Sequence, residues 1–270
     1  MRERPRWVGD LITIGGMAAL FGAVYLLPPD TSLAEVKKAG FLRVCVPTLY
    51  PPLVTGKPEA PGFDIEFAQA IAKRLDLRVV VNANAAMGRD FNPRNWNITR
   101  AQCQMLAGGV IVSDLTRSFL DTTPPHLQTG WALVAAQLPD QLQGVKVGFY
   151  SGLAGLDRIA LSRVLQAQKA RIEIVASAEA LIEGLRSGRI DAGVSEALMA
   201  SQIAGTLGAQ VAWLPEPLGR YPIAFGLWKG DLTLKRRLVE VIDDLEREGL
   251  TRELARRYRI APIDATLRLN

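Results

Sequence analysis

The stretch "GFDIEFAQAIAKRLDLRVVVNAN", Gly62 to Asn84, changes its pattern of apolar residues partway along. In its first part, apolar residues recur at the three- and four-residue spacing of one helix face. These residues are Phe63, Phe67, Ala70, Ile71 and Leu75. The second part, "RVVVNAN", is rich in β-branched residues and predicts a strand. With the strand predicted for "FLRVCVP", from Phe41, the order is strand, helix, strand, which is typical of a mostly parallel sheet covered by helices.

The same pattern starts again near residue 142, where the strand "LQGVKVGFY" is followed by the helix "LDRIALSRVLQAQKA" and the strand "RIEIVAS". Two α/β units in tandem predict two lobes with a cleft between them, and such clefts commonly bind ligands. We expect residues 31–133 and 225–270 to form lobe 1 and residues 134–224 to form lobe 2. The hinges should lie near "GWALVAAQ" and "YPIAFGLWK", where the chain crosses between the lobes. The segment "MGRDFNPRNWNITRAQC" has no pattern that predicts an element.

The composition excludes several classes of protein. Of the 270 residues, 49% are hydrophobic and 22% are charged, which is typical of a globular chain and not of a disordered or fibrous one. The formal net charge of +5 is spread along the chain, with no block of lysine and arginine that would bind nucleic acid.

An apolar run near the N-terminus, Trp7 to Leu27, reaches the roughly 20 residues that a bilayer requires. It follows Arg2, Arg4 and Arg6, so the positive-inside rule places the body of the protein outside the cytoplasm. The run ends in "LLPPD" without a small-x-small cleavage site. We therefore expect residues 1–30 to be an uncleaved membrane anchor that holds the body at the periplasmic face of the inner membrane. A cleaved signal segment, or a buried core helix, is the alternative.

Two cysteines, Cys45 and Cys103, lie at or near predicted strands. In an oxidising compartment such a pair can form a disulfide, and two buried free thiols are the alternative. The two cysteines and the single histidine, His126, do not make a metal site, and we expect no cofactor.

Six segments, taken in order, resemble the family 3 extracellular solute-binding proteins, the polar amino-acid receptors of ABC importers. The resemblance covers Leu33 to Ile260. The segments are "AGFLRVCVPTLYPPL", "GFDIEFAQAIAKRL", "SDLTRSFLDTTPP", "LQGVKVGFYSG", "SGRIDAGVSEA" and "EREGLTRELARRY". The resemblance implies the two-lobed type II periplasmic-binding-protein fold, in which each lobe is a mostly parallel α/β sheet flanked by helices. It also implies a ligand site between the lobes and an ABC permease as partner.

The resemblance also implies roles for particular residues. Arg117, in the turn after the third strand, would grip a ligand carboxylate, because a guanidinium binds carboxylates through two parallel hydrogen bonds. The hydroxyl of Ser113 and the backbone N–H of Gly109 would bind the same carboxylate. Tyr50 matches the aromatic residue that covers the ligand's side chain.

Other positions depart from the family pattern. Glu196 stands where the family usually has an aspartate that accepts the ligand's ammonium group. The loop of lobe 2 offers Ser151 and the backbone at Gly152 in place of a pair of hydroxyls. His126 replaces a frequent aromatic residue, and the turn before Arg117 is shifted by about one residue. We therefore expect recognition of a carboxylate to survive better than recognition of an ammonium group.

These observations predict a tethered receptor, not an enzyme, which captures a small carboxylate-bearing solute for an importer by closing its lobes. One alternative is a partner protein of a periplasmic quinoprotein dehydrogenase, since "LRVC" and "LDTTPP" are similar to solute-binding-like proteins of those systems. Another is a dehydratase of the prephenate or arogenate type, with Glu196 or His126 as general acid.

Overall fold

The computed structural model describes residues 13–19, 22, 29–88, 90–151 and 156–268. The chain divides into two compact units, Met1–Thr31 and Ser32–Asn270. In the first unit, residues 13–19 are helical and exposed. No helix in the described part of the chain is long and apolar enough to cross a membrane. The predicted membrane helix is therefore not supported, and most of residues 7–27 lie outside the described residues.

The second unit contains a mixed α/β fold in two lobes, each built on its own part of a ten-stranded sheet. In lobe 1 the strand order is β2-β1-β3-β10, and β4 also pairs with β10. Strands β1, β2 and β3 are parallel, and β10 is antiparallel to β3. These strands span Phe41–Pro47 (β1), Arg78–Asn84 (β2), Met105–Ile111 (β3), Leu120–Thr122 (β4) and Arg220–Trp228 (β10).

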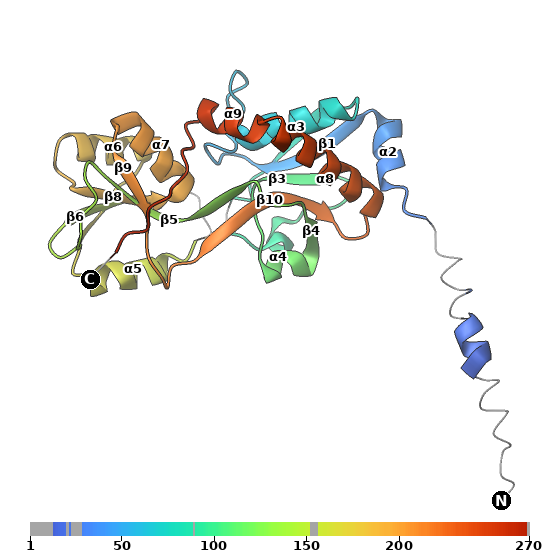
Figure 1. Cartoon of the computed structure of the whole chain (residues 1–270), viewed down its shortest axis with the longest axis horizontal. Helices are drawn as coiled ribbons and strands as arrows, with labels where there is room; N and C mark the ends of the chain where they lie inside the picture. Colours follow the sequence, from blue (N-terminus) through green and yellow to red (C-terminus); the bar gives the residue numbers. More distant parts are fainter. Residues whose placement is uncertain (1–12, 20–21, 23–28, 89, 152–155, 269–270) are drawn as a thin grey trace, which may run out of the picture. The chain divides into compact units, whose positions relative to one another are not determined.

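Both faces of the lobe 1 sheet are covered, as Figure 1 shows. Helices α3, α8 and α9 lie on one face and α4 on the other. Phe63 and Phe67 of α3 are fully buried against Phe225 of β10, which confirms the helical spacing read from the sequence. The helices are α2 (Ser32–Ala39), α3 (Phe63–Arg74), α4 (Asp114–Phe119), α8 (Leu232–Arg247) and α9 (Leu250–Arg257).

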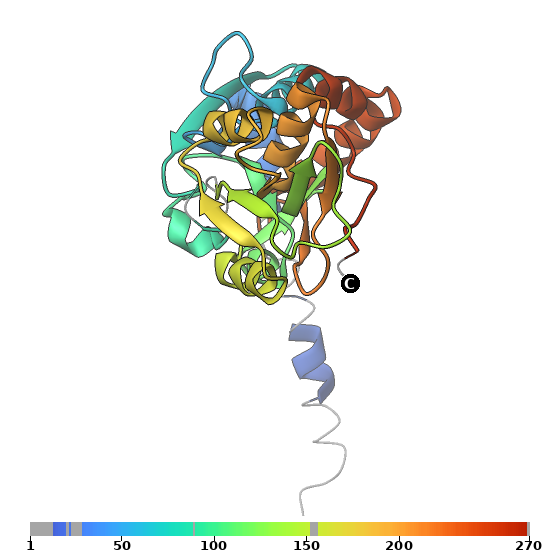
Figure 2. The same ribbon diagram turned by 90° about the vertical axis from the view of Figure 1, so that its left-hand side faces the viewer.

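In lobe 2 the strand order is β5-β8-β6-β7, and β9 pairs with β5. Neighbouring residues of β5 point to opposite faces: Leu133 packs in the cluster that includes Leu161 of α5, and Val134 in the cluster that includes Leu181 of α6. Helix α5 and the pair α6 and α7 therefore cover opposite faces (Figure 2). The strands are β5 (Leu127–Ala135), β6 (Lys146–Phe149), β7 (Arg171–Ile174), β8 (Ala192–Glu196) and β9 (Gln210–Trp213). The helices are α5 (Arg158–Ala167), α6 (Ala178–Arg186) and α7 (Ala197–Leu207).

The two lobes meet where the long strands β5 and β10 pair side by side in an antiparallel ladder. These are the two segments in which the sequence placed the hinges. The end of the chain departs from the predicted division into lobes, because it runs along β9 of lobe 2. There the Trp213 N–H donates to the carbonyl of Ala265 (2.9 Å) and the Leu267 N–H to the carbonyl of Trp213 (2.8 Å).

Candidate functional site

The first part of the candidate site is the turn after β1, which packs against the end of β3. Gly108 and Gly109 have positive φ angles (82° and 92°), which side chains other than glycine rarely allow. A Cβ atom on Gly109 would collide with the ring of Tyr50. The glycines thus allow the aromatic ring to lie directly on the backbone at the carboxyl end of the strand.

The backbone N–H groups of these glycines point at a buried carboxylate from α3. Asp64 Oδ2 accepts from Gly108 (2.6 Å) and from Gly109 (3.3 Å), while Oδ1 lies 2.9 Å from Nε2 of His126. The His126 ring is stacked between Phe63 and Phe225, with centroids 5.8 and 4.5 Å away. His126 directly precedes β5, so this pair links the glycine turn to the strand that crosses between the lobes.

Lobe 2 contributes Glu196, at the junction of β8 and α7. Its carboxylate caps α7, because Oε1 accepts from the backbone of Leu198 (3.1 Å) and Oε2 from that of Met199 (3.2 Å). The hydroxyl of Thr129, on β5, also donates to Oε1. Only 2% of the surface of Glu196 and none of that of Thr129 is exposed.

Tyr50 and Glu196 come close enough to act on one another electrostatically. Burial, followed by the negative charge of Glu196, raises the pKa of Tyr50 well above 10.0, while the Thr129 hydroxyl acts in the opposite direction. Burial also raises the pKa of Glu196, against the hydrogen bonds from Thr129, Leu198 and Met199. The Tyr50 hydroxyl itself is buried and makes no hydrogen bond of ordinary geometry with a described residue, so its contact with Thr129 is a weak one. Tyr50, Thr129 and Glu196 therefore form one buried cluster with contributions from both lobes.

The two residues predicted to bind a carboxylate from the turn after β3 lie on α4. Ser113 caps this helix, since its Oγ accepts from the Thr116 N–H at 3.1 Å. Thr116 is fully buried, whereas Arg117, the next residue, is exposed. None of the hydrogen bonds or ring contacts described for the cluster includes Arg117. Its role as a carboxylate clamp stays a prediction.

The remaining predicted residues have mixed outcomes. Ser151 is half-buried and Gly152 lies outside the described residues, so their roles also stay predictions. Cys45 and Cys103 form a disulfide with a Cα–Cα distance of 5.7 Å, which decides between the two alternatives for these thiols. The disulfide ties β1 to the segment that precedes β3.

Two further polar residues of this region were missed from the sequence. Asp64 was read only as part of a helix, because an acid in the first turn of a helix is usually exposed and its partners on β3 and His126 are more than 40 residues away. Thr129 gave no signal, because its partner Glu196 is 67 residues away along the chain.

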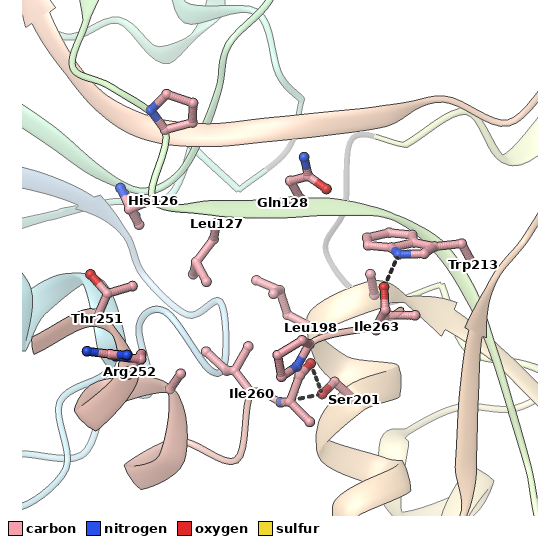
Figure 3. A pocket seen from close by; sticks show the side chains of 15 residues that line it. His126, Leu127, Gln128, Leu198, Ser201, Trp213, Thr251, Arg252, Ile260 and Ile263 are labelled. Carbon is pink, nitrogen blue, oxygen red and sulfur yellow. Dashed lines mark hydrogen bonds between the residues drawn. The ribbon is translucent and has the colours of Figure 1, made fainter. Parts of the chain in front are cut away.

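A pocket of about 480 Å³ lies beside the buried cluster, between the start of β5, α7 and the segment that follows α9, and its lining includes His126 and Leu198 (Figure 3). The lining is mainly apolar and also includes Leu127, Trp213 and Ile260. The residues predicted to bind ligand are not among those that line it. The segment after α9 is held by Ser201, whose hydroxyl bonds both the carbonyl (3.0 Å) and the N–H (2.8 Å) of Ala261.

Comparison with known proteins gives consistent matches over the same region. Residues 42–260 match the family described as bacterial extracellular solute-binding proteins, family 3. The L-cystine-binding protein TcyJ of Escherichia coli (strain K12) is 23% identical over 240 residues, which cover 84% of this chain and 85% of that protein. The probable amino-acid-binding protein YxeM of Bacillus subtilis (strain 168) is 22% identical over 209 residues, covering 73% of this chain and 75% of that protein.

Among solved structures, an ancestral cationic amino acid solute-binding protein, AncCDT-1, superposes with a TM-score of 0.68 at 23% identity. The match covers 84% of this chain and 99% of that one. A second structure of AncCDT-1, described as a precursor of cyclohexadienyl dehydratase, gives a TM-score of 0.57 at 21% identity, with the same coverage of both chains. At these identities the structural likeness shows the fold alone.

Proposed function

Because the chain belongs to family 3 of the bacterial extracellular solute-binding proteins, we propose that its second unit binds a small solute, an amino acid or a related amine or organic acid, between the two lobes. The observation that carries this proposal is the buried cluster of Tyr50, Thr129 and Glu196. Tyr50 follows the carboxyl end of β1 and Glu196 ends β8, and ligands of open α/β sheets bind at such ends. The names of the relatives, an L-cystine-binding and a probable amino-acid-binding protein, support this class of ligand.

Binding would be coupled to a hinge motion about β5 and β10. Tyr50 lies in lobe 1 and Glu196 in lobe 2, so a solute that contacts both is bound most tightly when the lobes close. A closed, loaded form is what an importer would distinguish from the empty form, and we propose an ABC permease as the partner that receives the solute.

The protein would work outside the cytoplasm. The disulfide between Cys45 and Cys103 supports this location, since disulfides persist in oxidising compartments. The arginines and the apolar run of residues 1–30 suit either an anchor or a signal segment, and we propose that they direct the second unit to the periplasm.

The dehydratase alternative has one observation in its favour. The raised pKa of Glu196 suits a general acid, which must hold a proton near neutral pH. Both oxygens of this carboxylate nevertheless accept hydrogen bonds from the start of α7 or from Thr129, which is a structural role. Binding therefore accounts for more of the site than proton transfer does.

A thermal-shift screen of the full chain against amino acids, amines and organic acids tests the proposal. A ligand at a hundred times its dissociation constant should stabilise the fold by about 2.7 kcal/mol, which raises the Tm by about 5 to 10 °C. Glu196→Gln should abolish the shift, and Glu183→Gln, at an exposed glutamate of α6, should keep it. A folded protein whose Tm responds to no compound in the screen contradicts the proposal.

A further inference from the structure

Glu196 is a buried carboxylate with no counter-ion among the residues that the structure describes. Three acidic residues are buried in the described part of the chain: Asp64, Glu196 and Asp231. Asp64 faces His126 at 2.9 Å and Asp231 faces Arg100 at 2.5 Å, whereas no lysine, arginine or histidine of the described residues lies within ion-pair distance of Glu196. Burying a carboxylate without a cation is costly. A cationic group of a ligand would therefore be stabilised beside this carboxylate.

The hydroxyl of Tyr50 lies in the same cluster, next to Thr129. The Tyr50 side chain is 92% buried, and its hydroxyl makes no hydrogen bond of ordinary geometry with a described residue, although Thr129 is near enough to lower its pKa. Buried polar groups are nearly always hydrogen-bonded, so this oxygen has the capacity to accept a hydrogen bond from a ligand. An ammonium group carries three N–H donors and no acceptor, which is the complement of a carboxylate and a phenol oxygen.

The groups that would bind a carboxylate are, by contrast, already used within the protein. The N–H groups of Gly108 and Gly109 both donate to Asp64, at 2.6 and 3.3 Å. The ring of Tyr50 also packs on Gly109, at the position that a Cβ atom of that residue would take. The glycine turn thus binds the protein's own carboxylate in place of a ligand's.

The other two candidate donors to a ligand carboxylate, Ser113 and Arg117, lie at helix α4 and do not point to the cluster as donors. The Ser113 hydroxyl is engaged with Thr116, through both its backbone N–H and its Oγ1, at 3.1 Å each. Successive residues of a helix are rotated by about 100° around its axis, so a shift by one residue changes the direction of a side chain completely. Thr116 takes the inward direction and is fully buried, which leaves Arg117 exposed.

We propose that this site recognises an ammonium group and makes no use of a carboxylate, so that the ligand is a small organic amine that lacks the α-carboxylate of an amino acid. The inference rests on the proposed function as a receptor. On binding, the ammonium group would donate to Glu196 and Tyr50, and the buried carboxylate would gain its counter-ion. A ligand with an ammonium group and no carboxylate would then account for both departures from the family pattern, at Glu196 and in the turn before Arg117.

Matched compounds test the proposal directly. Phenethylamine, phenylalanine and 3-phenylpropionate share a side chain and carry, respectively, an amine alone, both groups, and a carboxylate alone; agmatine and arginine form a second pair. Each compound would be titrated calorimetrically into the full chain at neutral pH. We expect at least one amine to bind about tenfold or more tightly than its amino acid, and the acid not to bind.

Variants then locate the binding. Tyr50→Phe removes one oxygen without changing the shape of the side chain and should weaken amine binding several-fold. Glu196→Gln should weaken it by about tenfold or more, and Glu183→Gln serves as the matched control. Circular dichroism checks that each variant is folded. If Glu196→Gln does not fold, Tyr50→Phe still tests the proposal.

The outcomes separate the inference from the proposed function. If an amino acid binds more tightly than its amine, and Arg117→Ala abolishes that binding, the amine proposal is wrong and the receptor function stands. If neither class binds to the folded protein, both are wrong. Amine binding that is unchanged in Tyr50→Phe and Glu196→Gln would place the amine elsewhere and overturn the inference.

Discussion

At the scale of single residues, the direction of each side chain decides what the site can bind. The segments that carry Tyr50, Arg117 and Glu196 follow one another in the order of the family that they resemble. The structure brings Tyr50 and Glu196 into one cluster. Arg117 could not be placed from the sequence, because one residue of helical phase separates a buried position from an exposed one. Asp64 could be recognised as helical, but its acceptance of the glycine N–H groups depends on a strand that begins 41 residues later at Met105.

The protonation of Glu196 should be visible in the stability of the unliganded protein. Burial raises the pKa of this carboxyl above its ordinary 4.5 in the folded state, while the unfolded chain titrates near the ordinary value. The stabilisation from its proton is therefore complete below pH 4.5 and is lost as the pH rises through the raised folded-state pKa.

We expect the Tm of the wild type to fall, relative to that of Glu196→Gln, as the pH is raised from about 4.5 towards neutral. Thermal unfolding of both proteins across this range, followed by circular dichroism, measures the difference. Glu183→Gln should track the wild type. A difference between wild type and Glu196→Gln that stays constant with pH would show that the carboxyl titrates normally.

At the scale of elements, periodic segments could be predicted and the segment before β3 could not. Helix α3 follows from the spacing of its buried residues. The described residues between 85 and 104, in contrast, contain one short 3-10 helix, η1 (Pro93–Trp96), and otherwise turns and irregular chain. They are held by individual contacts, such as the hydrogen bonds from Asn95 Nδ2 to the Asp90 carboxylate (2.8 Å) and from Trp96 Nε1 to the Asp90 carbonyl (3.0 Å). Contacts of this kind leave no repeat in the sequence.

The disulfide is a covalent contact of this segment, and it joins positions that are 58 residues apart in the sequence. Cross-linking a loop of this length restricts the unfolded chain and typically stabilises a fold by about 2 to 4 kcal/mol. We expect the double substitution Cys45→Ala and Cys103→Ala to lower the free energy of unfolding by this amount in urea. Reduction of the wild type should have a similar effect. An unchanged urea midpoint in both experiments would mean that the segment before β3 is held by its hydrogen bonds alone.

At the scale of the whole second unit, the repeated α/β pattern predicts two lobes, and the structure has two lobes built on the two parts of one sheet, which β5 and β10 join. The sequence could not show that the end of the chain returns to lobe 2, because the pairing of Trp213 with Ala265 and Leu267 joins segments with no shared periodicity. The cluster of Tyr50 and Glu196 depends on the two-lobed arrangement, because Tyr50 lies in lobe 1 and Glu196 in lobe 2.

Hydrogen exchange with and without the ligand that the thermal-shift screen selects is the most direct test of binding between the lobes. We predict that the ligand slows exchange in both halves of the site at once: in the turn that carries Tyr50, and at the amides of Leu198 and Met199, which donate to the capping carboxylate of Glu196. Slower exchange in only one lobe, or only in residues 251–263 beside the pocket next to α9, would contradict the account.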